Sequence, residues 1–170
     1  MNILETMLSA AGGGIVNQLA GQFGISADQA TAATSALLPA LAGGLKEKLA
    51  GGDASGITNL IGSGKLTQFA DNPASLATPA ALDQGKSLLS KIFGSGDTSS
   101  LVSAVAQKVG LSSGLITTML PIAATLLGSL LSKKAAAGAN LADTVGQFAS
   151  VGHSGLLDAV KGLTSKMLGS

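Results

Sequence analysis

The stretch that decides the fold runs from residue 110 to residue 132 and reads GLSSGLITTMLPIAATLLGSLLS. Small and hydroxyl side chains recur in it at spacings of three and four residues, while Leu, Ile and Met fill the remaining positions. This is the period of an α-helix with a broad apolar face and a narrow polar stripe. Such a helix is typical of the centre of a bundle, where other helices cover it.

The same stretch is also long enough to cross a membrane. No charged residue occurs between Lys108 and Lys133, and such a length spans a hydrocarbon core of about 30 Å. The regular small and polar stripe is better explained by packing against neighbouring helices than by contact with lipid. We therefore expect a central bundle helix here and not a membrane span.

Each of two long helices is predicted to begin at a serine that closely follows a glycine. Gly24-Ile25-Ser26 precedes one and Gly110-Leu111-Ser112 precedes the other. The glycines suit the left-handed C-caps of shorter helices expected at about 14–23 and 99–109, and the serines are placed to N-cap the long helices.

Both long helices contain a proline. Pro39 and Pro121 each follow a leucine, and Ser35 and Thr117 precede them by four residues. Proline leaves the carbonyl four residues earlier without its helical donor, so a kink is predicted at both places.

These parallels predict an all-α fold, a compact bundle of two tandem homologous units with about three to four helices each. The pattern of residues 57–62 recurs at 141–146 as a further short helix. Asn72-Pro73 and Thr78-Pro79 are the best boundary signal. The units are therefore expected at 1–79 and 80–170, and they can share one core.

A shorter pattern occurs three times. Residues 3–8, 88–93 and 163–168 share one apolar pattern, and two small residues follow each copy. The first two copies open the two units, and the third stands where another unit would begin. We expect the third copy to dock on the first unit of a neighbouring molecule. The residues expected to mediate this association are Leu163, Met167 and Leu168.

A family resemblance rests on the most regular part of the chain. LLSKIFG at 88–94, a helix ending in QKVGLSS at 107–113 and the proline-bearing helix with terminal lysines together resemble the YidB-like family. That family comprises small bacterial helical proteins rich in Ala, Leu and Gly, of unknown function. The resemblance implies an all-α fold and brings no catalytic residues.

The composition disfavours several classes of function. Charged residues make up 11% and aromatic residues 2%, and all ten basic residues are lysines, so we expect no nucleic-acid partner. There is no cysteine, which excludes disulfides and thiolate metal sites. The opening residues MNILE lack the basic segment of a secretory signal, so a cytoplasmic protein is expected.

Two motifs look chemical but have simpler interpretations. Ser112 lies in a Gly-x-Ser-x-Gly pattern, and Asp143 and His153 follow in the chain order of an α/β-hydrolase. A helix and not a strand precedes Ser112, so an N-cap is the favoured role. Residues 80–87 loosely match a phosphate-binding loop, again without the required strand. We therefore expect no enzyme, no cofactor and no metal site.

The remaining hypothesis is structural. Apolar helices with few charges predict a non-catalytic protein that associates with itself as a homo-oligomer or a filament. The alternative is a monomeric module that binds an apolar ligand, a partner helix or a membrane surface. The lysines near the ends of the long helices are compatible with an anionic membrane surface.

Overall fold

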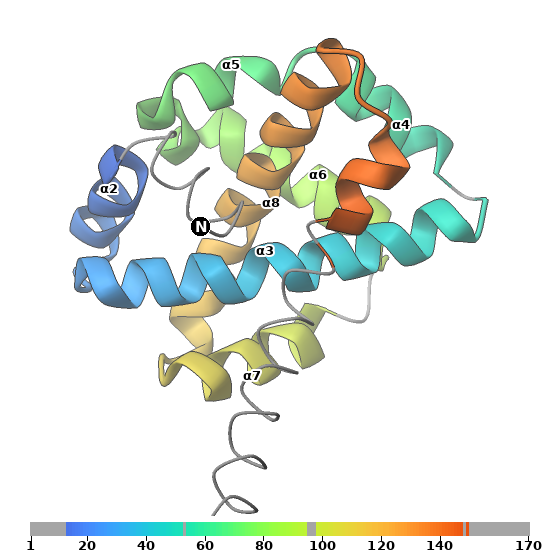
Figure 1. Cartoon of the computed structure of the whole chain (residues 1–170). Coiled ribbons are helices and arrows are strands. Elements are labelled where there is room, and N and C mark those ends of the chain that lie inside the picture. The colour runs from blue at the N-terminus through green and yellow to red at the C-terminus, as the bar shows by residue number, and fades with distance from the viewer. Residues whose placement is uncertain (1–12, 53, 95–97, 148, 150–170) are drawn as a thin grey trace, which may run out of the picture.

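The computed structural model describes residues 13–52, 54–94, 98–147 and 149, and this part of the chain is helical without a strand (Figure 1). The expected all-α compact bundle is confirmed. Residues 141–147 are also helical. The other helices are α2 (Gly13–Phe23), α3 (Ala27–Ala50), α4 (Ser55–Gly62), α5 (Thr67–Asp71), the 3₁₀ helix η1 (Pro73–Ala77), α6 (Pro79–Phe93), α7 (Thr98–Val109) and α8 (Ser113–Ala136).

Helix α8 lies at the centre of the bundle. It packs against α3, α4, α5, α6 and α7, and it crosses the middle of the molecule in Figure 1. Every residue from Met119 to Ser129 is buried. Among the described residues α8 is the one helix long and apolar enough to span a membrane, and 72% of its most apolar window is buried in the fold. Its hydrophobicity is therefore accounted for by its neighbours in the core.

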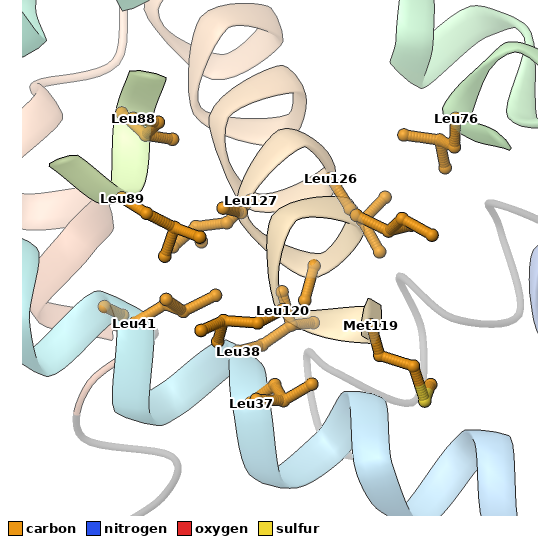
Figure 2. Packing of buried hydrophobic residues seen from close by; sticks show 14 of the residues in the cluster. Leu37, Leu38, Leu41, Leu76, Leu88, Leu89, Met119, Leu120, Leu126 and Leu127 are labelled. Carbon is orange, nitrogen blue, oxygen red and sulfur yellow. The ribbon is translucent and has the colours of Figure 1, made fainter. Parts of the chain in front are cut away.

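The buried apolar side chains form one cluster that draws on both predicted units. Leu38 of α3 lies beside Leu120 of α8, and Leu89 of α6 meets Leu127 (Figure 2). Leu126 lies on another side of α8, the side toward η1. The two halves of the sequence therefore share a single core made almost entirely of aliphatic side chains.

The segment around the predicted boundary is itself part of this core. Residues 67–77 form α5 and η1, which pack against α8, and Phe69 and Leu76 are 3% and 2% exposed. Proline and asparagine in this segment shape a 3₁₀ turn, with Pro73 at its start. Asn72-Pro73 and Thr78-Pro79, which have the sequence pattern of a linker, therefore lie in a short segment that packs against the core.

Helices α6 and α8 approach each other at Gly85. A Cβ placed on Gly85 would lie 1.9 Å from the carbonyl oxygen of Pro121 and 2.7 Å from Oγ1 of Thr125. Any side chain at position 85 would therefore separate the two helices. The absence of a side chain here lets the two backbones touch.

Replacing Gly85 with alanine is expected to destabilise the protein. The new methyl group would overlap a backbone carbonyl that cannot rotate away, which costs about 1–3 kcal/mol of unfolding free energy. Gly21 of α2 is the matched control, since a Cβ there meets no described atom within 4 Å. Gly21→Ala should raise stability by up to about 1 kcal/mol through helix propensity. Urea unfolding of both variants, followed by circular dichroism, measures this contrast.

Candidate functional site

Three of the buried polar side chains lie along one stripe of α8. Thr125, Ser129 and Ser132 are 0%, 0% and 2% exposed, and they recur at helical spacing with Gly128 between them. This is the buried end of the stripe that the sequence predicts. At the other end of the helix, Thr117 and Thr118 are exposed and donate to the carbonyls of Ser113 and Gly114.

Each buried hydroxyl donates to a backbone carbonyl. Thr125 Oγ1 lies 2.6 Å from the carbonyl oxygen of Ala81 in α6 and 3.0 Å from that of Pro121. Ser132 Oγ lies 2.7 Å from the carbonyl oxygen of Ile61 in α4. The Ser129 hydroxyl bonds within α8, to the carbonyl of Leu126. Two of the three hydroxyls thus connect α8 to other helices, and all three have their protons engaged, as buried polar groups require.

The buried hydrogen bond of Ser132 lies next to an ion pair that is exposed to solvent. Lys133 pairs with Asp71 at the end of α5. Their side chains are 59% and 63% exposed, so water and salt screen the attraction. Buried hydroxyls contribute more to holding α8 in place than this surface pair does.

Removing the Ser132 hydroxyl is therefore expected to cost more than removing the charge of Asp71. Ser132→Ala leaves the Ile61 carbonyl buried without its donor, at about 1–3 kcal/mol. Asp71→Asn should change the unfolding free energy by no more than about 1 kcal/mol, as is usual for exposed pairs. Chemical denaturation at low and high salt tests both values. A larger loss in Asp71→Asn than in Ser132→Ala would contradict this ranking.

Ser26 and Ser112 both lie at N-caps. The Ser26 hydroxyl accepts from the backbone N–H of Gln29 at 3.2 Å, and the Gln29 side chain accepts from the Ser26 N–H at 3.1 Å. This reciprocal pair is a capping box. The Ser112 hydroxyl accepts from the N–H of Leu115 at 3.4 Å. Both serine hydroxyls accept from a backbone N–H in the first turn of the helix that follows, so the geometry is that of a cap.

Gly24 and Gly110 end the helices that precede these caps. Their φ angles are +64° and +69°, in the left-handed region that glycine enters without strain. The N–H of Ile25 then bonds to the carbonyl of Ala20, and the N–H of Leu111 bonds to that of Ala106. Both turns therefore have the hydrogen bond of a Schellman motif.

The two prolines occupy different environments. Helices α3 and α8 both continue through their prolines. Pro121 is buried at the contact with α6, whereas Pro39 is half-buried. The Thr125 hydroxyl donates to the carbonyl of Pro121, four residues earlier. In α3 the residue four positions after Pro39 is Gly43, which has no hydroxyl. Of the two prolines, Pro121 is the one that contacts a glycine of another helix, Gly85 of α6.

The residues of the hydrolase-like pattern fall in three settings. Ser112 is an exposed cap, and Asp143 is exposed in the helical segment 141–147. His153 lies outside the described residues, as do the predicted association residues Leu163, Met167 and Leu168. The phosphate-loop-like residues 80–87 are inside α6. From Leu82 onward the helix occupies the backbone N–H groups that such a loop would offer to phosphate, and the N–H of Ala81 bonds to the Thr78 hydroxyl.

Two features of α6 were not singled out in the sequence. Gly85 forms the close crossing, and the side-chain oxygen of Gln84 is buried without a hydrogen-bond partner. A glycine in the middle of a long amphipathic helix, away from any C-cap, is the signal that could have identified Gly85. Within the described ranges no cluster of three potential metal ligands occurs.

The cap serines give a direct test of their role. Ser26→Ala and Ser112→Ala should each lower the unfolding free energy by about 1 kcal/mol. Asp, which also accepts from the N3 backbone N–H and suits the positive end of the helix dipole, should restore stability at either position. Thermal unfolding of the Ala and Asp variants provides the measurement. Equal losses for Ala and Asp would argue against capping.

Comparison with protein families supplies one match. Residues 5–134 match the model of the family described as "Bacterial protein of unknown function (DUF937)". No curated protein and no solved structure matches the chain. The match covers most of the 170 residues and includes α2 to α7 and α8 up to residue 134, whereas the helical segment 141–147 lies outside it. The chain therefore belongs to this family.

Proposed function

We propose that this family member is a non-catalytic structural protein that associates with itself as a homo-oligomer or a filament. The observation that carries the proposal is the burial of the middle copy of the apolar pattern that occurs three times in the sequence. Residues 88–93 end α6, and Leu88, Leu89 and Ile92 are 0%, 7% and 2% exposed. In α6 the apolar residues of this pattern are therefore buried against other helices. Residues 163–168 carry the same pattern, with apolar residues at the positions of Leu88 and Ile92 and a threonine at that of Leu89.

The settings of the polar groups support a role without chemistry. The hydroxyls of α8 donate to carbonyls, and the serines at the helix starts serve as caps. An acyl-transfer site would need a hydroxyl hydrogen-bonded to a base. Apolar packing is the property that this chain has in abundance, with 46% hydrophobic residues against 11% charged.

We further propose that α2–α3 and α7–α8 derive from a duplication and that the chain belongs to the YidB-like group. The support is local. Helices α3 and α8 have 24 residues each, both follow a glycine with positive φ, and both start at a serine cap. Such units can pair within one chain or between chains, which is one route to oligomers.

Replacing Leu163 with aspartate is expected to reduce the oligomer to a smaller species. A carboxylate at an apolar contact would have to be buried unpaired, at a cost of several kcal/mol. Met167→Asp should act in the same way. The measurement is size-exclusion chromatography with light scattering over a wide range of concentrations.

Ser165→Asp is the matched control, because it adds the same charge at a position whose counterpart in α6, Ser90, is exposed. It should leave the oligomer unchanged. A wild-type monomer at every concentration would exclude self-association and favour the binding module instead. Native mass spectrometry of protein purified from cells would then show a bound lipid or partner.

A further inference from the structure

The sequence of α6 recurs at residues 157–170 over a longer range than the short apolar pattern. Aligned on Leu88 and Leu163, residues 82–95 and 157–170 need no gap, and eight of the fourteen positions are identical. Ile92 and Phe93 are replaced by the apolar residues Met167 and Leu168. The identical residues are Leu82, Asp83, Lys86, Leu88, Ser90, Lys91, Gly94 and Ser95, which recur as Leu157, Asp158, Lys161, Leu163, Ser165, Lys166, Gly169 and Ser170.

Helices α3 and α8 also correspond position by position when they are aligned on Ser26 and Ser112. In this alignment one face is buried in both helices. The aligned pairs are Ala30 with Ile116, Ala33 with Met119, Leu37 with Ala123, Leu38 with Ala124, Leu41 with Leu127 and Leu45 with Leu131. The two helices therefore present equivalent faces to the shared core.

They differ on the adjoining face. In α8 this face contains Pro121 and Thr125, and α6 covers it through Gly85 and the hydrogen bond from Thr125. The equivalent residues of α3 are Ser35 and Pro39, which are exposed and half-buried. One turn further on, a Cβ at Gly43 would meet no described atom within 4 Å. Helix α3 thus has an equivalent of the face that α6 covers on α8, and its residues there are exposed or half-buried.

We propose that this face of α3, formed by Ser35, Ala36, Pro39, Ala40 and Gly43, binds residues 154–168 of a second copy of this chain. The segment takes the place on α3 that α6 takes on α8. Residues 150–170 lie outside the described part, and their length is sufficient for a helix of the 15 residues of α6. The inference rests on the proposed self-association and assigns its acceptor surface.

The side chains on the two sides are compatible in size. Where α6 has Ala81 and Gly85, the C-terminal segment has the larger Leu156 and Val160. The acceptor face consists of small side chains beside Pro39, which leaves room for these larger residues. Val160 also means that this crossing is wider than the backbone contact at Gly85.

Cysteine cross-linking tests the contact in a chain without native cysteine. Gly85 contacts Pro121, so the alignment pairs Val160 with Ser35. Full-length Ser35→Cys and Val160→Cys proteins are mixed and treated with a short thiol cross-linker. The expected major product is a covalent dimer containing one of each variant. The double variant should form a ladder of multimers. The control is Ser35→Cys mixed with Ser165→Cys, whose new thiol should lie on the opposite side of the segment and should cross-link poorly.

Three results would overturn the proposal. The first is cross-linking within one chain of the double variant, which would place the segment on its own α3. The second is equal yield from the control pair. The third is no cross-link in a sample that light scattering shows to be oligomeric, which would leave self-association intact and exclude this surface. A sample that stays monomeric at every concentration would overturn the proposed function together with this inference.

Discussion

The contact on which the bundle depends is the approach of two backbones, at Gly85 of α6 and Pro121 of α8. Aliphatic side chains bury little area each, at about 25 cal/mol per Å², so a core with few aromatic residues needs short distances between helices. Gly85 permits the short distance, and Thr125 fixes the register by donating to the carbonyl of Ala81. The remaining helices then pack around this pair.

The polar residues of the fold divide according to burial. The polar residues buried in the described part of the chain carry hydroxyls, whose bonds to carbonyls are shielded from water and leave no charge to desolvate. Charges lie outside, as in the pair between Lys133 and Asp71. This division explains how a chain with so few charged residues still specifies one arrangement of its helices. The relative orientation of the helices is set by hydrogen bonds to backbone carbonyls, whose positions are fixed within each helix.

The sequence predicts some parts of this structure well because the signals are local. Ser26 and Ser112 are followed by long periodic helices, and the pattern of α8 is that of a helix covered on all sides. Helices α5 and η1 could not be predicted, because five residues are too few to show a period and Pro73 suggests a linker. The sequence shows a glycine in the middle of this helix, but not its contact with Pro121, since that depends on which helix lies opposite. The association residues Leu163, Met167 and Leu168 remain predictions.

The central position of α8 has a consequence for how the chain acquires its structure. The partners of this helix come from far earlier in the sequence, as in the bonds from Thr125 to Ala81 and from Ser132 to Ile61, which span 44 and 71 residues. Contacts over such separations form slowly. On the ribosome, α3 to α6 are made before α8, so the leucines that face α8 lack this cover until its last residue, 136, has been made. Because of the order of its helices, the nascent chain therefore exposes apolar surface during that interval, and this surface must be kept from aggregating.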